Sequence, residues 1–174
     1  MNDPRRPASI ASRVVLSLLA VVPLATTAQE HHDHAQHAMH GAVGAVSQLQ
    51  LNGSAKWETD ASLRAGMAAI RDAFDADHAA IHAGKETDAA YDALAMKIEA
   101  QVNDIVAHCK LPPQADANLH YVIADLLQGA SLMKGTDPAQ SRHAGAARVH
   151  GALNAYGKYF DDPAWKPASM PSSH

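Results

Sequence analysis

Four segments of this chain carry apolar residues at steps of three and four, and short breaks separate them. The segments cover roughly residues 60–84, 88–111, 116–135 and 137–160. This spacing places the apolar side chains on one face of an α-helix, and such a face must be buried against other helices. Because each connection has only a few residues, neighbouring helices must run antiparallel. The sequence therefore predicts an all-α, up-down-up-down antiparallel four-helix bundle over residues 49–166.

Capping residues and helix breakers mark the ends of the predicted helices. Three of the starts offer a side-chain oxygen as cap, from Thr59 or Asp60, from Thr87 or Asp88, and from Asp137 ahead of Pro138. The third predicted helix starts around Asp116. The predicted stops are Gly84, Pro112–Pro113, Gly135 and Asp161–Asp162–Pro163.

Residues 1–28 have the three parts of a secretory signal peptide. Three arginines supply positive charge, and residues 14–25 form an almost wholly apolar run. That run is shorter than the ~20 residues needed to span a bilayer. Small residues follow, so we expect cleavage before Gln29 and export to the periplasm. Two alternatives stay open: twin-arginine export, which the Arg5–Arg6 pair suggests, and an uncleaved anchor, which the short run disfavours.

A histidine-rich tract follows the predicted cleavage point. It holds five imidazoles, a carboxylate and a thioether within residues 31–40, and it has no core-forming pattern. Neutral imidazole is the commonest protein ligand for borderline metals, and copper(II) heads the affinity order for nitrogen sites. We therefore expect residues 29–48 to be a flexible tail and linker that captures copper, with zinc or nickel as open alternatives. The candidate ligands in the tract are His31, His32, Asp33, His34, His37, Met39 and His40.

Charge and cysteine content exclude several classes of function. The chain has a formal net charge of −4, and loss of residues 1–28 makes it more negative, because they hold three arginines and one aspartate. An acidic protein is a poor partner for nucleic acid or for an anionic membrane surface. The single cysteine, Cys109, cannot form an internal disulfide. The sequence has no glycine-rich phosphate loop, nucleophile elbow or Cys-x-x-Cys pair, so we expect no enzymatic activity.

Two short segments resemble the soluble periplasmic b-type cytochromes. They are Leu63-Arg-Ala-Gly-Met67 and Asn154-Ala-Tyr-Gly-Lys-Tyr159. The resemblance implies a four-helix bundle with haem held by a methionine of the first helix and a histidine of the last. Met67 matches the methionine, but the histidine position falls on Gly157. The related c-prime cytochromes need Cys-x-x-Cys-His, which the nearest segment, residues 107–110, does not supply. We therefore expect haem to bind weakly or not at all.

Three longer segments look like an uncharacterised proteobacterial periplasmic family that is sometimes labelled DnrO-like. They lie at residues 57–67, 109–120 and 156–165. The likeness extends over roughly residues 49–165. It implies the bundle fold and the periplasmic compartment, and it implies no reaction.

Met67 and Cys109 are the candidate ligands inside the bundle, because a thioether and a thiolate suit copper(I). Both have simpler interpretations, since methionine fills irregular gaps in cores and free cysteine is among the most buried residue types. Histidines at the edges of the apolar faces are, on the simpler view, solvated or capping residues. Heights calculated from a rise of ~1.5 Å per residue predict two internal groups. One group contains Met67, His120 and His150, and the other contains His78, Met133 and His143.

These features favour a periplasmic, non-enzymatic protein that binds copper for capture or homeostasis. The first alternative is a haem-binding electron carrier that uses Met67 and His150. The second is a structural or partner-binding bundle whose histidine tract is incidental. The sequence indicates no particular protein partner, and we expect residues 167–174 to be disordered.

Overall fold

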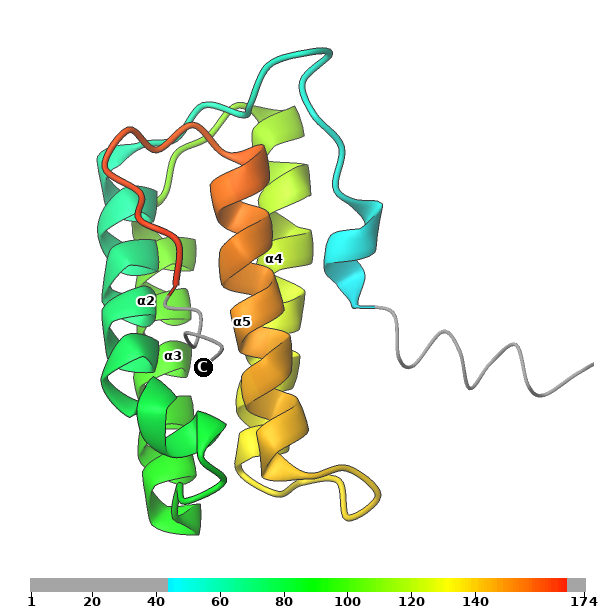
Figure 1. Ribbon diagram of the computed structural model, residues 1–174. Helices are drawn as coiled ribbons and strands as arrows, with labels where there is room; N and C mark the ends of the chain where they lie inside the picture. The colour runs from blue at the N-terminus through cyan, green and yellow to red at the C-terminus, as the bar shows by residue number, and fades with distance from the viewer. Residues whose placement is uncertain (1–43, 169–174) are drawn as a thin grey trace, which may run out of the picture. The chain divides into compact units, whose positions relative to one another are not determined.

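The computed structural model describes residues 44–168, which form four helices arranged as a bundle (Figure 1). The helices are α2 (Ala61–His82), α3 (Asp88–His108), α4 (Pro113–Met133) and α5 (Arg142–Tyr159), and a short 3-10 helix, η1 (Ala45–Gln48), precedes them. Within residues 44–168 there are only isolated β-bridges and no strand. The predicted all-α, up-down-up-down fold is confirmed. The predicted signal peptide and the histidine tract lie outside the described residues, as does almost all of the predicted C-terminal tail.

Side-chain caps begin three of the four helices. Asp60 accepts a hydrogen bond from the backbone N–H of Leu63 at 2.7 Å, and Thr87 accepts one from Ala90 at 3.2 Å. These contacts decide between the two cap candidates at each of those helices. The third of these caps differs from the prediction, because Ser141 rather than Asp137 caps α5.

Two helix starts are displaced from their predicted positions. Asp137 accepts from the N–H of Ala139 at 2.9 Å, so it stabilises a turn before α5 instead of starting that helix. Helix α4 begins at Pro113, three residues before the predicted start. Proline at the first helical position has no N–H to leave unsatisfied, so Pro112–Pro113 ends one helix and begins the next.

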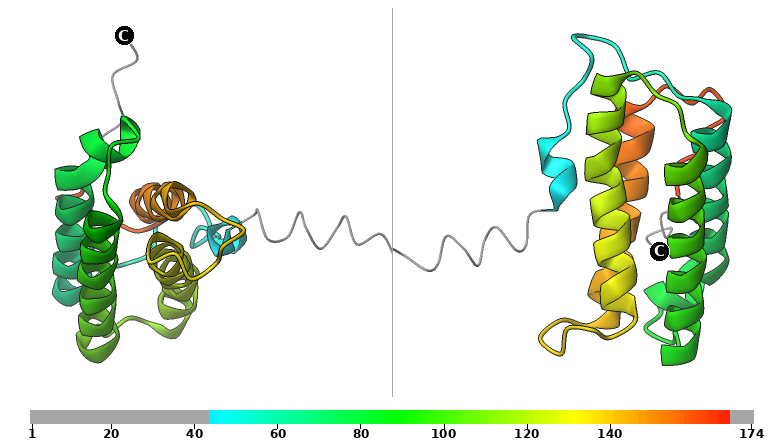
Figure 2. Two further views of the ribbon diagram at one scale, coloured as in Figure 1. Left: turned by 90° about the horizontal axis from the view of Figure 1, so that it is seen from below. Right: turned by 180° about the vertical axis from the view of Figure 1, so that it is seen from behind.

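Helices α4 and α5 pack most closely, whereas α2 and α5 make the sparsest contact of the neighbouring pairs. Two glycines permit the close approach. A Cβ on Gly145 would lie 2.6 Å from the carbonyl oxygen of Gly129, and a Cβ on Gly129 would lie 2.8 Å from that of Gly145. Viewed along the helix axes, α2–α3 and α4–α5 form two pairs (Figure 2). The α2–α5 seam is therefore the more open side of the bundle.

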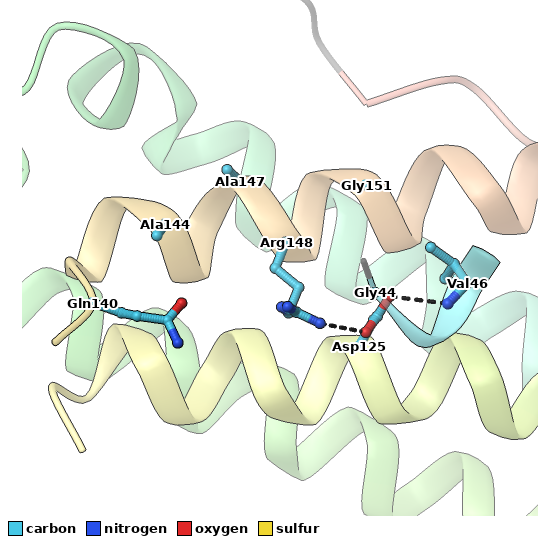
Figure 3. Close-up of a pocket in the computed structure, with 8 residues that line it drawn as sticks. All are labelled: Gly44, Val46, Asp125, Gln140, Ala144, Ala147, Arg148 and Gly151. Carbon is cyan, nitrogen blue, oxygen red and sulfur yellow. Dashed lines mark hydrogen bonds and ion pairs between the residues drawn. The ribbon is translucent and has the colours of Figure 1, made fainter. Parts of the chain in front are cut away.

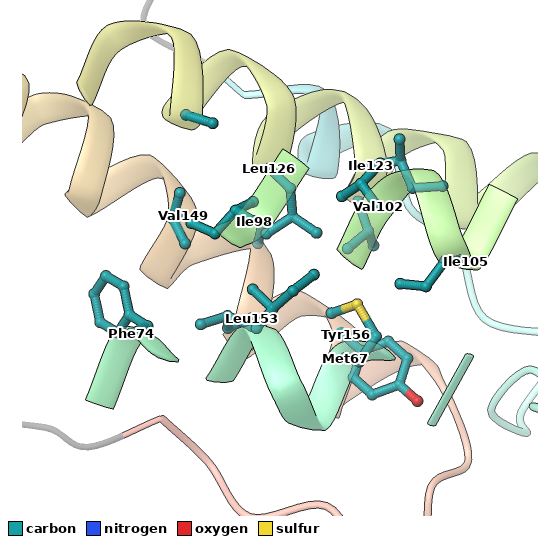
Figure 4. Packing of buried hydrophobic residues seen from close by; sticks show 14 of the residues in the cluster. Met67, Phe74, Ile98, Val102, Ile105, Ile123, Leu126, Val149, Leu153 and Tyr156 are labelled. Carbon is teal, nitrogen blue, oxygen red and sulfur yellow. The ribbon is translucent and has the colours of Figure 1, made fainter. Parts of the chain in front are cut away.

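Apolar side chains from all four helices fill the space between the pairs (Figure 4). The predicted stripes are buried: Met67, Ile98, Leu126 and Leu153 are each 0% exposed. None of the helices in residues 44–168 is both long and apolar enough to cross a bilayer.

The segment that follows the histidine tract is attached to the bundle by a buried carboxylate. Asp125 on α4 is 2% exposed and accepts from the backbone N–H groups of Ala45 and Val46 at 2.9 and 3.1 Å. It also pairs with Arg148 of α5 at 2.8 Å (Figure 3). Residues 45–48, expected as part of a flexible linker, instead form η1 against α4. The bundle domain therefore includes these residues, and its predicted start at residue 49 is too late.

The chain after α5 folds back over the bundle. Trp57 and Phe160 form a bridge, with Trp57 N–H donating to the Tyr159 carbonyl at 2.8 Å. Trp165 then packs edge-on against Tyr156, with ring centroids 4.7 Å apart, and Arg71 lies 5.2 Å from its centroid. Ala168 is buried, so the ordered domain extends slightly beyond the predicted end at residue 166.

Candidate functional site

Four histidines line one pocket of about 270 Å³ at the α2–α5 seam. His78 and His82 come from α2, and His143 and His150 come from α5. Residues four apart on a helix lie on the same side, and residues seven apart are separated by two turns. Each helix therefore presents a pair of imidazoles to the seam. His82 and His143 are exposed, whereas His78 and His150 are partly buried.

The two partly buried rings, His78 and His150, make aromatic contacts. The His150 ring stacks on Phe74 with centroids 5.7 Å apart and planes inclined by 11°. The His78 centroid lies 6.3 Å from that of His150 and 6.2 Å from that of His82. Within residues 44–168, no three His, Cys, Asp or Glu side chains form a ready-made metal centre. The four imidazoles share the pocket without forming such a centre.

The surroundings of His150 favour its neutral form. Burial lowers the pKa of His150 and the neighbouring His78 lowers it further, while the carboxylate of Asp75 opposes both effects. The neutral form carries the lone pair that binds metals. At neutral pH, His150 is therefore in the protonation state that metal binding requires.

The position of His150 differs from the height calculation, which placed it with Met67 and His120. In an α-helix the Cα–Cβ bonds tilt toward the N-terminus. Because α2 and α5 run antiparallel, the side chains of His78 and His150 lean toward each other. The two rings are therefore closer along the bundle axis than the calculated heights of their backbones. His120 lies exposed on α4, with Nδ1 2.8 Å from the Asp116 carbonyl oxygen.

The seven candidate ligands of the histidine tract lie outside the described residues. They are His31, His32, Asp33, His34, His37, Met39 and His40.

Met67 is completely buried in the apolar core (Figure 4). An ion could reach its sulfur only by losing its water shell within a tightly packed interior, which is costly for a charged species. This environment agrees with the simpler interpretation of Met67 as a core residue. It gives copper(I) no evident path to the thioether.

Cys109 caps the C-terminal end of α3 and is partly buried. Burial, together with the charge of Asp60 and the hydrogen bond to it, raises the pKa of the Cys109 thiol to about 11. Metals bind the thiolate, so a metal at Cys109 must first displace this proton. The thiol is better suited to its hydrogen bond with Asp60 than to a preformed metal site.

Gly157, which the resemblance to b-type cytochromes aligns with a haem-ligand histidine, lies against the Trp165 side chain. A Cβ placed on Gly157 would collide with Nε1 of Trp165. A side chain at residue 157 would therefore force the Trp165 indole, which packs directly on the backbone there, to move. The Met67–His150 alternative meets a further obstacle, since His150 is stacked on Phe74 whereas Met67 is enclosed in the core.

Sequence reasoning missed two features of this region. The grouping of His78, His82 and His150 was missed, although the His78-x₃-His82 spacing was a visible signal. Asp125 was also missed, and its signal was a carboxylate beside Val122, Ile123 and Leu126 on the apolar face of α4.

Comparison with known proteins gives no relative from which a function could be transferred. No protein-family model, no curated protein and no solved structure matches this chain significantly.

Proposed function

We propose that this chain is a periplasmic, non-enzymatic metal-binding protein, with copper as the first candidate metal. The observation that carries the proposal is the density of ligands in residues 31–40, where five imidazoles accompany a carboxylate and a thioether. The sequence of this segment has no core-forming pattern, and imidazole is a good ligand for copper(II), zinc and nickel. The signal-peptide pattern of residues 1–28 supports export, and the DnrO-like resemblance supports the periplasm.

In this proposal, the bundle anchors the chain a few residues after the tract. Asp125 binds the backbone N–H groups of Ala45 and Val46, and Gly44 lies only four residues after His40. The core is formed by apolar side chains, so we expect the bundle to fold without metal. Metal capture by the tract is then independent of the folding of the bundle.

A haem-carrier function is less consistent with the described residues. Gly157 replaces the expected axial histidine, and Trp165 occupies the space in which its side chain would begin. A partner-binding bundle with an incidental tract is the remaining alternative. Metal analysis of untagged protein separates the three: copper supports the proposal, a Soret band supports haem, and neither supports the partner-binding bundle.

The proposal is tested by replacing the five tract histidines with alanine and titrating copper(II) and zinc(II) by calorimetry. We expect the variant to lose most of its bound metal and to keep at most one ion per chain. Affinity of the wild-type tract should fall as pH drops through ~6.5, because imidazole must be neutral to bind. A variant that keeps the full metal stoichiometry contradicts the proposal. His108→Ala/His120→Ala is the matched control, since it removes exposed histidines outside both the tract and the pocket.

A further inference from the structure

We infer that His78, His82 and His150 form a second metal site, which holds one divalent transition-metal ion at the α2–α5 seam. This inference goes beyond the proposed function, which concerns the histidine tract alone. It concerns only residues of the bundle, and it can fail while the tract still captures metal.

The α2 pair has the spacing that helical metal sites use. Two histidines at positions i and i+4 lie on one helix face, as in helical zinc motifs. His78 and His82 have this spacing, and their ring centroids are 6.2 Å apart. Two imidazoles bound to one tetrahedral ion at about 2.0–2.1 Å per bond have ring centroids about 5 Å apart. The pair is therefore within a small side-chain movement of the required separation.

The third ligand comes from the facing helix. The His150 centroid is 6.3 Å from that of His78, which is nearly the same separation as within the α2 pair. His78 is thus the ring that lies near both of the others. Three imidazoles from two helices leave a fourth position for water or for His143, which lines the same pocket.

The surroundings allow the rings to converge. His82 is exposed and can change rotamer freely, and the pocket gives about 270 Å³ in which the rings can move. The α2–α5 seam is also the most loosely packed interface between neighbouring helices. We therefore expect the metal ion to draw the three rings into its coordination shell.

The environment of His150 suits a metal ligand. Phe74 stacks on its ring and restricts the ring orientation. Asp75 lies close enough to interact electrostatically with His150, and carboxylates near metal-bound imidazoles commonly orient them. A bound cation would gain from this negative charge.

The test uses the full mature chain with the five tract histidines replaced by alanine as host. We expect the host to bind one zinc(II) or copper(II) ion per chain in calorimetry, and we expect the ion to raise its melting temperature, because a ligand that binds only the folded state stabilises it. In NMR, the ring protons of His78, His82 and His150 should shift together as metal is added. A host that binds no ion overturns the inference, whatever the wild-type tract does.

Two variants of the host identify the ligands. His82→Ala removes an exposed ring, so its fold should be intact, and the double variant His78→Ala/His150→Ala removes the other two. We expect each to weaken metal binding by more than about tenfold, since even loss of an orienting neighbour costs 10–100-fold. The control, His108→Ala/His120→Ala, should bind as the host does. If the double variant does not fold, His82→Ala decides: unchanged affinity in that variant overturns the inference, as does a loss in the control equal to that in the test variants.

Discussion

At the scale of single residues, Asp60 connects the start of α2 with the end of α3, which lies 50 residues away in the sequence. It caps α2 through the N–H of Leu63 and also accepts from the N–H of Lys110 at 2.5 Å, just after α3. Desolvation is the largest influence on its pKa and raises it. The hydrogen bonds from Leu63, Lys110 and Cys109, with the charge of Arg64, outweigh desolvation and lower the pKa of Asp60 below its ordinary value.

Asp60→Ala should lower the free energy of unfolding by about 0.5–2 kcal/mol, the range for loss of an N-cap. Asp60→Asn, which keeps an acceptor for Leu63, should cost less. Because the folded pKa lies below the unfolded one, the contribution of Asp60 is present above pH ~3.9 and is lost as pH falls through the folded pKa. Urea unfolding at pH 7 and pH 3 measures both effects. Equal stability of Asp60→Ala and wild type at pH 7 contradicts the capping role.

Cys109 should be an unreactive thiol at neutral pH. With a pKa of about 11, little thiolate is present at pH 8, and the thiolate is the nucleophile. We expect slow alkylation by iodoacetamide in the folded protein, with a rate that rises steadily toward pH 11. The rate at pH 8 should increase in Asp60→Asn, because the aspartate charge contributes to the raised pKa. Mass spectrometry of the adduct measures the rate, and rapid alkylation of the wild type at pH 7 contradicts the assignment.

At the scale of helices, two glycines determine how closely α4 and α5 approach. Gly145→Ala should lower the free energy of unfolding by about 1–3 kcal/mol, the usual cost of overpacking, because its Cβ would lie 2.6 Å from the Gly129 carbonyl oxygen. Gly151→Ala on the same helix is the matched control. Nothing lies within 4 Å of a Cβ at Gly151, so alanine there should stabilise the helix by up to about 1 kcal/mol. Urea unfolding of both variants measures these changes in stability. If both substitutions change the free energy of unfolding in the same direction, the prediction is wrong.

Helix identity was predictable from the sequence, but two helix starts were not. Apolar spacing reports which segments are helical, because burial requires it. A start depends on which of several nearby polar groups accepts the first N–H. Asp137 and Ser141 are both good caps, and only the turn built around Asp137 decides that Ser141 begins α5. Similarly, Pro113 belongs to the proline pair that was predicted to end the preceding helix, and it is also the first residue of α4.

At the scale of the whole molecule, the candidate site was only partly predictable. His78-x₃-His82 is visible in the sequence, since the two residues share a helix face. The participation of His150 depends on the relative level and side-chain tilt of two antiparallel helices, which a calculation of rise alone does not contain. Asp125 shows the same limit, because its partners Ala45 and Val46 are about 80 residues away in sequence. The residue patterns did not predict contacts between segments that are distant in the sequence.

The attachment of η1 to Asp125 leads to a prediction about truncation. Starting the mature chain at Gly44 removes the histidine tract but keeps both N–H donors to Asp125, so the melting temperature should barely change. Starting it at Leu49 removes η1 and leaves the buried carboxylate with fewer hydrogen bonds, at a cost of about 1–3 kcal/mol. For a domain of this size, that cost corresponds to a loss of several degrees, at about 4 °C per kcal/mol. Calorimetric melting of the two truncations, in chelator so that metal cannot contribute, distinguishes a structural η1 from an incidental one. Equal melting temperatures show that η1 adds nothing to the stability of the bundle. A large loss in the chain that starts at Gly44 shows instead that the segment before Gly44 also contributes.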